Sequence, residues 1–216
     1  ALPISRIRDD LQDIADAALG KKRMPDRRRF PAGLLDIAAQ RAPDATWVRA
    51  GMDEIPLPDA SFDVVTSFNG LQFGGPSAVA EAARILRPGG RIGIGFWEDP
   101  GEYGPLFAAM GALAPAPIPG APSPMAFAAP GVAEGFLADA GLRPLHRSVV
   151  TCVGLYRSVD DARRGFAASG AAHAAMQHSG EAAVHEALSA VLARHVDPGS
   201  GVVRLSGVMA YVVASG

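Results

Sequence analysis

The chain has 216 residues, of which 49% are hydrophobic, and its formal net charge is −2 at neutral pH. This content is enough for one domain with a full core, so it excludes an intrinsically disordered chain. The small net charge argues against a surface built to bind nucleic acid or an anionic membrane. Cys152 is the single cysteine, which excludes an internal disulfide framework. No apolar run has the length of a signal peptide or a membrane span, so we expect a soluble, cytoplasmic protein.

The N-terminal part combines a predicted helix with a basic segment. Residues 4–19 carry apolar side chains at helical spacing and predict an amphipathic helix that ends at Gly20. The following GKKRMPDRRRF, residues 20–30, contains both lysines of the chain and is expected to be a solvated loop, with phosphate binding as the alternative. A second helix is predicted over residues 32–42, and TWVRAG, residues 46–51, predicts a strand.

The next segment has the pattern of a parallel βαβ unit. DEIPLPDASFDVVTSF, residues 53–68, is an acidic turn with two prolines that leads into a buried strand over 62–68. In SAVAEAARILRPGG, residues 77–90, a helix is expected to end before Pro88 in a tight glycine turn, with Glu81 and Arg84 as a surface pair. RIGIGFW, residues 91–97, predicts the second strand, so we expect parallel pairing and a right-handed crossover.

The C-terminal half alternates helices and strands after a long connecting segment. Residues 99–131 are rich in Pro, Gly and Ala without strong periodicity, which is typical of a lid or binding loop. The remaining predicted elements are a helix over 131–142, a strand over 143–156, helices over 159–180 and 181–196 with a break near Gly180, and a strand over 201–216. The alternation predicts an α/β fold with a doubly wound, mostly parallel sheet.

Three segments together resemble the class I S-adenosylmethionine-dependent methyltransferases, in particular the small-molecule group called methyltransferase type 11. They are DEIPLPDASFDVV (53–65), NGLQF (69–73) and EAARILRPGGRIGIGFW (81–97). The resemblance runs from about residue 31 to 216. FLADAGLRPLHR and VVRLSGVMAYVVA resemble that family's sixth and seventh strands, which form an antiparallel hairpin at the sheet edge. The resemblance to this family implies a Rossmann-like single domain over 1–216. Its expected parts are an atypical helix and basic loop (1–30), a partial nucleotide-binding core (31–98), a lid and substrate region (99–140), and C-terminal strands and helices (141–216).

The resemblance implies S-adenosylmethionine as the cofactor and places two loops beside it. The loop before the strand would lie along the adenine ring, and the loop after it would pass the methionine part of the cofactor. The residues implied as cofactor-binding are Gly51, Met52, Asp53, Ser67, Phe68, Asn69 and Gly70. Asp53 and Glu54 have an alternative reading as a solvated acidic turn, and Asn69 and Gly70 as a strand-to-helix turn.

The family's glycine-rich turn has no counterpart in residues 1–30. The family's first strand ends in a Gly-x-Gly-x-Gly turn whose backbone amides approach the cofactor. The acid that holds the ribose would fall near Arg29, and the acid beside the adenine amine would fall at Gly51, with Asp53 two residues away as a possible substitute. Three explanations stay open: a full protein longer than this chain, a deletion or frameshift in its gene, or a retained fold that has lost cofactor binding.

Candidate substrate-binding residues are aromatic and methionine side chains in and around the expected lid, with core or lid packing as the alternative for each. They are Phe73, Trp97, Tyr103, Phe107, Met125 and Phe127. His173 is the candidate general base, because a histidine titrates near neutrality. We expect no metal site, since His178 and His185 would lie about 10 Å apart along one helix.

Two functions follow from these observations. The first is methyl transfer from S-adenosylmethionine to a small-molecule acceptor. The alternative is a methyltransferase-like protein that has lost cofactor binding and acts as an accessory or binding subunit, or catalyses another reaction. A small-molecule substrate is expected, with no nucleic-acid or membrane partner. A gap in the sheet where the first strand is missing would favour homo-oligomers.

Overall fold

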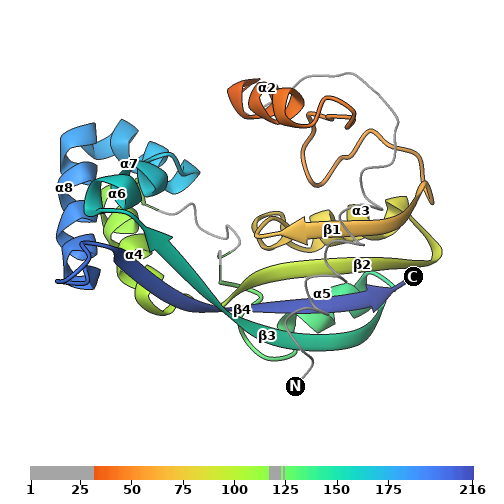
Figure 1. The fold of residues 1–216 in the computed structure, drawn as a ribbon. Coiled ribbons are helices and arrows are strands. Elements are labelled where there is room, and N and C mark those ends of the chain that lie inside the picture. Colours follow the sequence, from red (N-terminus) through yellow and green to blue (C-terminus); the bar gives the residue numbers. More distant parts are fainter. Residues whose placement is uncertain (1–31, 117–122, 124) are drawn as a thin grey trace. The chain divides into compact units, whose positions relative to one another are not determined.

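The computed structural model describes residues 32–116, 123 and 125–216, and Figure 1 labels its elements. The predictions for the helix over 4–19 and for the basic segment over 20–30 lie outside the described residues. The elements in chain order are α2 (Ala32–Arg41), β1 (Phe62–Phe68), η1 (Leu71–Phe73), α3 (Gly75–Ile85), β2 (Leu86–Asp99), η2 (Gly101–Tyr103), α4 (Gly104–Leu113), α5 (Val132–Asp139), β3 (Arg143–Tyr156), α6 (Val159–Ala167), α7 (Gly170–Ser179), α8 (Glu181–Leu192), η3 (Ala193–His195) and β4 (Val203–Ser215).

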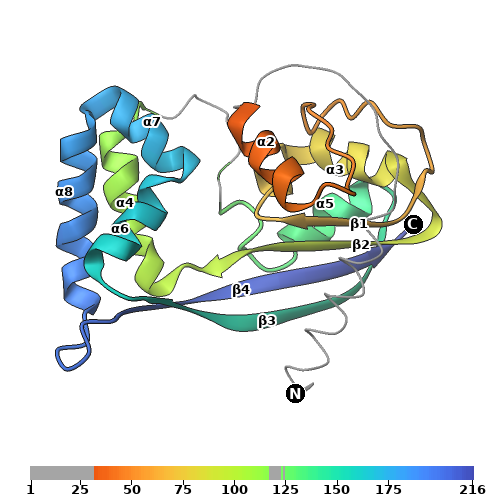
Figure 2. The same cartoon turned by 45° about the horizontal axis from the view of Figure 1, so that its top comes forward.

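The four strands form one sheet in the order β1-β2-β4-β3. β1 and β2 are parallel, as the βαβ pattern predicts. The arrow of β4 points against those of the other three strands in Figures 1 and 2. The prediction of an α/β fold with parallel strands and an antiparallel C-terminal pair is confirmed. β3 and β4 are neighbours in the sheet, but α6, α7 and α8 come between them in the chain.

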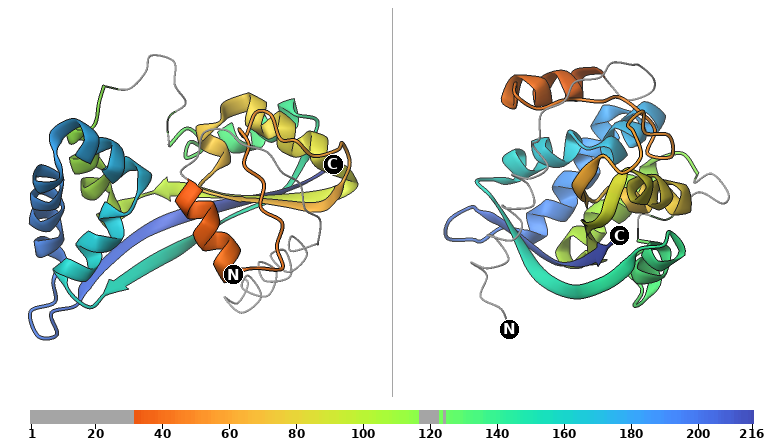
Figure 3. Two further views of the ribbon diagram at one scale, coloured as in Figure 1. Left: turned by 90° about the horizontal axis from the view of Figure 1, so that it is seen from above. Right: turned by 90° about the vertical axis from the view of Figure 1, so that its right-hand side faces the viewer.

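The register of β1 and β2 gives the sheet two unlike faces. Val65 pairs with Ile92 and Ser67 with Ile94, and both isoleucines are buried. Thr66 pairs with Gly93 and Phe68 with Gly95, so the opposite face has glycine in β2 where the first face has isoleucine. Because paired residues in a sheet point to the same side, the ring of Phe68 lies over Gly95. Figure 3 shows α3 (yellow) and α5 (green) beside the sheet.

The chain divides into two compact units. The first contains the described residues up to Phe96, those of Pro122–Ser148, and Tyr211–Gly216. Its core is built from α3, α5 and β2, and Phe96, Phe127 and Leu137 are fully buried there. The second unit contains the described residues of Trp97–Ala121 and Val149–Ala210. Its core lies among α4, α6, α7, α8 and β4 and includes Leu106, Leu188 and Leu205.

Two predictions about local structure are wrong. TWVRAG, residues 46–51, forms no strand, and only an isolated bridge joins Gly51 to Glu54. The segment has strand-forming residues, but no described strand lies beside it, and a strand needs a paired neighbour. The expected irregular lid contains a helix, α4, with Leu106 and Met110 buried one turn apart. Its sequence is apolar on all sides, so it carries no amphipathic pattern that would have predicted it.

Two further boundaries differ from the predictions. Residues 159–180 form two helices rather than one, because the Ser169 side chain accepts a hydrogen bond from the Ala172 amide and begins α7. The expected turn at Pro88-Gly89-Gly90 is part of β2, which begins at Leu86. Gly89 does have the left-handed backbone angle (φ 77°) that the turn required of a glycine.

Candidate functional site

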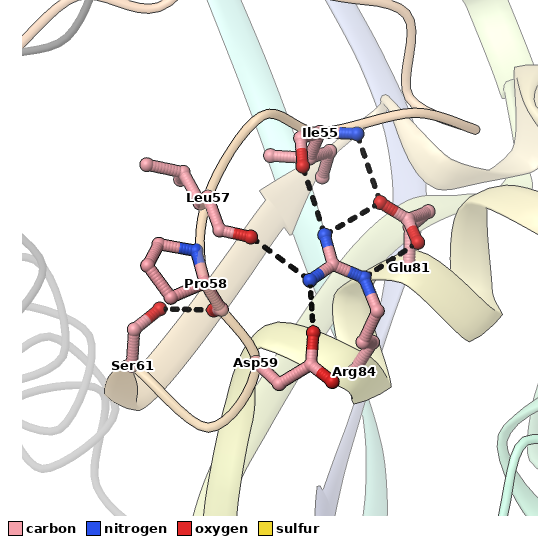
Figure 4. A network of polar contacts seen from close by, with 7 residues as sticks. All are labelled: Ile55, Leu57, Pro58, Asp59, Ser61, Glu81 and Arg84. Carbon is pink, nitrogen blue, oxygen red and sulfur yellow. Dashed lines mark hydrogen bonds and ion pairs between the residues drawn. The ribbon is translucent and has the colours of Figure 1, made fainter.

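The loop that precedes β1 is fixed to α3 by one arginine (Figure 4). Arg84 donates to the carbonyl oxygens of Ile55 and Leu57, both at 2.8 Å, and to the Asp59 carboxylate. Its guanidinium also makes two hydrogen bonds to Glu81, at 2.7 and 2.8 Å. The predicted surface pair of Glu81 and Arg84 therefore exists, and Arg84 also holds this loop against α3 by hydrogen bonds. The spacing of the two residues predicted the pair and gave no signal for the loop contacts.

Glu81 binds the same loop through the amide of Ile55. Its carboxylate accepts a hydrogen bond from the Ile55 amide at 2.8 Å, and its side chain is only 18% exposed. The hydrogen bond from Arg84, followed by that from Ile55, lowers the pKa of Glu81 from 4.5 to about 2, against the opposing effect of burial. The hydrogen bond to Glu81, followed by that to Asp59, raises the pKa of Arg84. Both groups are therefore charged whenever the protein is folded near neutral pH.

A tight turn at the start of this loop presents the carboxylate of Asp53. The Glu54 amide donates to the Gly51 carbonyl oxygen at 3.3 Å, which closes the turn. A Cβ atom built on Gly51 would lie 2.5 Å from Asp53 Oδ1. The carboxylate of Asp53 therefore occupies the space that a side chain at position 51 would take. Met52 packs at the start of α3, where its Cε would lie 3.3 Å from a Cβ atom on Gly74.

The turn after β1 is held by side-chain hydrogen bonds. The Leu71 amide donates to Ser67 Oγ at 3.0 Å. The Asn69 amide donates to the Gly95 carbonyl oxygen at 2.8 Å, and Asn69 has a left-handed backbone (φ 48°), which asparagine tolerates better than most residues. Gln72 is only 3% exposed and donates to Asn69 Oδ1 at 3.3 Å. The turn predicted at Asn69 and Gly70 is thus present, and Gln72 is a supporting residue that the sequence did not reveal.

Phe68 is exposed at the end of β1. It is 62% exposed, and its ring lies 3.2–3.4 Å from the position a Cβ atom on Gly95 would take. Any side chain at position 95 would displace this ring. Met52 lies against Gly74, next to the start of α3, so in the first unit the turn of Gly51–Asp53 and the turn of Ser67–Gly70 lie near the same end of β1. Each turn is fixed by its own hydrogen bonds.

The candidate substrate residues divide between the two units. In the first unit Phe73 is 50% exposed and Met125 is half-buried, whereas Phe127 is 1% exposed and packs edge-on against Phe96 with ring centroids 5.6 Å apart. Phe127 is therefore a core residue, which was the alternative to its predicted role in substrate binding. In the second unit Trp97, Tyr103 and Phe107 form one aromatic cluster, with Trp97 5.1 Å from Tyr103 and 6.0 Å from Phe107 between ring centroids.

His173 lies on α7 and is exposed, and its side chain has no hydrogen-bond partner among the described residues. The Arg163 guanidinium donates a hydrogen bond to His185 Nδ1 at 2.8 Å. In the described part of the chain, no three His, Cys, Asp or Glu side chains gather in a way that could hold a metal ion. The described helices include none that is long and apolar enough to cross a membrane.

Comparisons with known proteins agree with this architecture. Residues 30–94 match the sequence profile of the family described as "Methyltransferase domain". A malonyl-[acyl-carrier protein] O-methyltransferase of Serratia marcescens is 39% identical over 62 residues, which are 28% of this chain and 24% of that protein. An uncharacterized methyltransferase of Mycobacterium tuberculosis is 37% identical over 62 residues, 28% of this chain and 26% of that protein. The chain thus spans about a quarter of the length of these curated relatives.

Solved structures show the same fold at low sequence identity. A putative methyltransferase from Bacillus halodurans has a TM-score of 0.51 and 12% identity, over 86% of this chain and 79% of that one. The YcgJ protein of Bacillus subtilis has a TM-score of 0.50 and 13% identity over the same shares. Residues 30–94 are therefore similar to a methyltransferase domain, and the chain shares the fold of these two solved structures.

Proposed function

We propose that this chain carries out S-adenosylmethionine-dependent methyl transfer to a small-molecule acceptor. The observation that supports this most directly is the position of the Asp53 carboxylate in the space of a side chain at position 51. Position 51 matches the family's acid beside the adenine amine, and here it is glycine. A carboxylate that reaches the same place from two residues further on can accept the same hydrogen bonds.

Several described residues fit the cofactor. Asp53 would hold the adenine end, and the loop that carries it is fixed by Arg84 and Glu81 before any ligand binds. Such preorganisation lowers the cost of binding, since the loop is not ordered at that moment. The turn of Ser67–Gly70 would lie along the methionine end. The bound cofactor supplies an electrophilic methyl group, and the protein has to align the acceptor, exclude water and, where needed, take up a proton. His173, which is exposed and whose side chain has no hydrogen-bond partner within the part of the chain that the structure describes, is the base we propose.

The acceptor does not follow from the similar proteins. The segment matched by the family profile, residues 30–94, includes the Asp53 loop, β1 and most of β2. It ends before Trp97, Tyr103 and Phe107. The malonyl-[acyl-carrier protein] named in the Serratia relative is therefore one acceptor to test, alongside free small carboxylic acids.

A carboxylate exchange tests the proposed role of Asp53. The chain is titrated calorimetrically with S-adenosylmethionine and with S-adenosylhomocysteine. Asp53→Ala should weaken binding about tenfold to a hundredfold, as expected for the loss of one hydrogen bond to a charged group. Gly51→Asp combined with Asp53→Ala should recover most of that loss, because the carboxylate returns to the same space from position 51. Glu54→Gln, on the neighbouring acid, is the matched control and should bind like the wild type.

Two results would decide against the proposed role. If the chain binds the cofactor and Asp53→Ala binds equally well, Asp53 is a solvated turn residue. If Gly51→Asp does not restore the binding lost in Asp53→Ala, the acid acts elsewhere in the loop. Circular dichroism on each variant separates a loss of binding from a loss of folding.

A methyltransferase-like protein without cofactor binding is the second candidate function. Within residues 32–116, 123 and 125–216, β1 is the last strand at its side of the sheet, and no Gly-x-Gly-x-Gly turn occurs. A strand edge with the exposed Phe68 beside it would suit a binding or accessory role. A cooperatively folded sample that binds neither cofactor at millimolar concentration would favour this candidate over methyl transfer.

A further inference from the structure

The second unit has an exposed apolar stripe on β3. Val149 is 50% exposed, Val153 46% and Leu155 68%, and Thr151 between them is also exposed. The four side chains alternate along one face of the strand, and the intervening residues from Val150 to Tyr156 are half-buried. We call Val149, Thr151, Val153 and Leu155 the β3 stripe. Exposed apolar side chains in a continuous row indicate an interaction surface rather than scattered surface residues.

Among the described strands, the stripe lies on the one at the edge of the sheet. β3 is the last strand in the order β1-β2-β4-β3, and β4 is its hydrogen-bonded neighbour in the sheet. Along its outer edge, alternate backbone N–H and C=O groups are available to another strand. Proteins usually protect such an edge with charged residues or proline. SVVTCVGLY, residues 148–156, contains neither.

We infer that a second copy of this chain pairs with the outer edge of β3 in an antiparallel, two-fold arrangement. The pattern of the stripe is nearly the same in both directions around Thr151. With Thr151 on the two-fold axis, Val149 faces the partner subunit's Val153, and Thr151 faces the partner subunit's Thr151. Pairs of β-branched residues across antiparallel strands stabilise a sheet. An uncharged strand also matches its own copy without requiring a partner of opposite charge.

The residue types along the stripe select this register. With Thr151 on the axis, each threonine faces its own copy and each Val149 faces a Val153. With Cys152 on the axis instead, the polar Thr151 would lie opposite the apolar side chain of the partner subunit's Val153. Arg147 takes no part in this choice, because its guanidinium forms an ion pair with Glu134 at 3.3 Å and lies over the Phe96 ring.

The interface rests on one short strand from each copy. Its area would fall below the roughly 1,200 Å² of stable protein complexes, so we expect a reversible dimer. The proposal concerns only the second unit and is independent of cofactor binding. It would hold equally for a methyltransferase and for a protein that has lost that activity.

Cysteine cross-linking tests the register directly. All variants carry Cys152→Ser, which removes the natural thiol. Thr151→Cys places two thiols opposite each other on the two-fold axis. At about 100 μM protein, a dimer with a micromolar dissociation constant is populated, so mild oxidation should give a disulfide-linked dimer. Val149→Cys is the matched control, since it faces the partner subunit's Val153 and should remain largely monomeric. Val149→Cys together with Val153→Cys should cross-link again.

Light scattering after size exclusion tests the dimer without cross-links. The wild-type chain should change from monomer to dimer as its concentration rises, and Val153→Lys and Thr151→Lys should each remain monomeric with unchanged circular dichroism spectra. The inference is overturned if the wild-type chain is monomeric at about 100 μM, where such a dimer would form. It is also overturned if Val149→Cys alone cross-links as readily as Thr151→Cys, because the pairing would then have no register.

Discussion

At the scale of single residues, the ion pair of Glu81 and Arg84 also binds the backbone of a distant loop. Three positions apart on α3, they form the pair that their spacing predicts. Through hydrogen bonds to the backbone of Ile55 and Leu57, which lie 26 to 29 residues earlier in the chain, the pair also fixes the loop that carries Asp53. A pair that is part-buried and also bonded to the backbone stabilises a protein more than an exposed pair does.

The lowered pKa of Glu81 predicts how stability depends on pH. Because the pKa of Glu81 falls from 4.5 to about 2 on folding, its contribution is complete above pH 4.5 and is lost as the pH falls towards 2. Glu81→Gln should lower the free energy of unfolding at pH 7 by about 1–3 kcal/mol, the range for a hydrogen bond to a charged group. The difference from the wild type in urea unfolding should shrink progressively between pH 5 and the pKa of about 2.

Asp63→Asn is the control for this experiment. Asp63 forms an ion pair with Arg87, but the two side chains are 78% and 50% exposed. Its replacement should change the free energy of unfolding by less than about 0.5 kcal/mol, as for most exposed pairs. A difference between the wild type and Glu81→Gln that stays constant from pH 7 to 2.5 would contradict the assigned cause of the lowered pKa.

At the scale of secondary-structure elements, a single serine separates two helices. Residues 159–180 have enough alanine to predict one continuous helix, but Ser158 caps α6 and Ser169 caps α7. The Ser169 hydroxyl accepts a hydrogen bond from the Ala172 amide at 3.2 Å. The extended backbone of Ser169 then changes the direction of the chain, so that Ala172 and Ala175 are both buried.

Substitutions at Ser169 test this capping role. Ser169→Ala should destabilise the protein by about 1 kcal/mol in thermal or urea unfolding, because an amide at the start of α7 loses its partner. Ser169→Asp should retain most of the stability, since aspartate caps equally well and suits the positive end of the helix dipole. Equal loss in both variants would show that the packing of the side chain, rather than its hydrogen bond, decides the stability.

At the scale of the whole molecule, β2, β3 and β4 each contribute residues to both compact units. Strands shared in this way should make the two units unfold together, because neither can lose its strands alone. Each unit also contains one tryptophan: Trp47 in the first and Trp97 in the second. The two units can therefore be followed separately by fluorescence.

Leu188→Ala tests this coupling. Leu188 is fully buried in the core of the second unit, so the substitution should lower the free energy of unfolding by about 2–5 kcal/mol. The substitution is made in two separate variants, Trp47→Phe and Trp97→Phe, each of which retains one tryptophan. Both remaining tryptophans should report the same shift of the unfolding midpoint, although Leu188 lies in only one unit. A shift seen by Trp97 alone would show that the units unfold independently. Leu155→Ala, at a site that is 68% exposed, is the control in dilute protein.

Much of the fold followed from local patterns. Strands over 62–68 and 143–156 have the predicted bounds, because β-branched residues bounded by turn residues encode a strand locally. The failures have one cause. TWVRAG is not a strand, because no strand of the described residues lies beside it. The helix α4 was not predicted, because its apolar residues lie on all sides and their burial depends on elements far away in the chain.

The sequence by itself determined the resemblance to a methyltransferase domain, most of the helices and strands, and the types of residue at each end of β1, because these depend on short patterns. Only the tertiary structure decided how Arg84 fixes the Asp53 loop, that Asp53 occupies the side-chain space of Gly51, and that Gln72 supports Asn69. It also showed that the β3 stripe lies on the last of the described strands at its side of the sheet. Each of these facts depends on which distant segments are neighbours in space, and contacts of this kind leave no periodic signal along one chain.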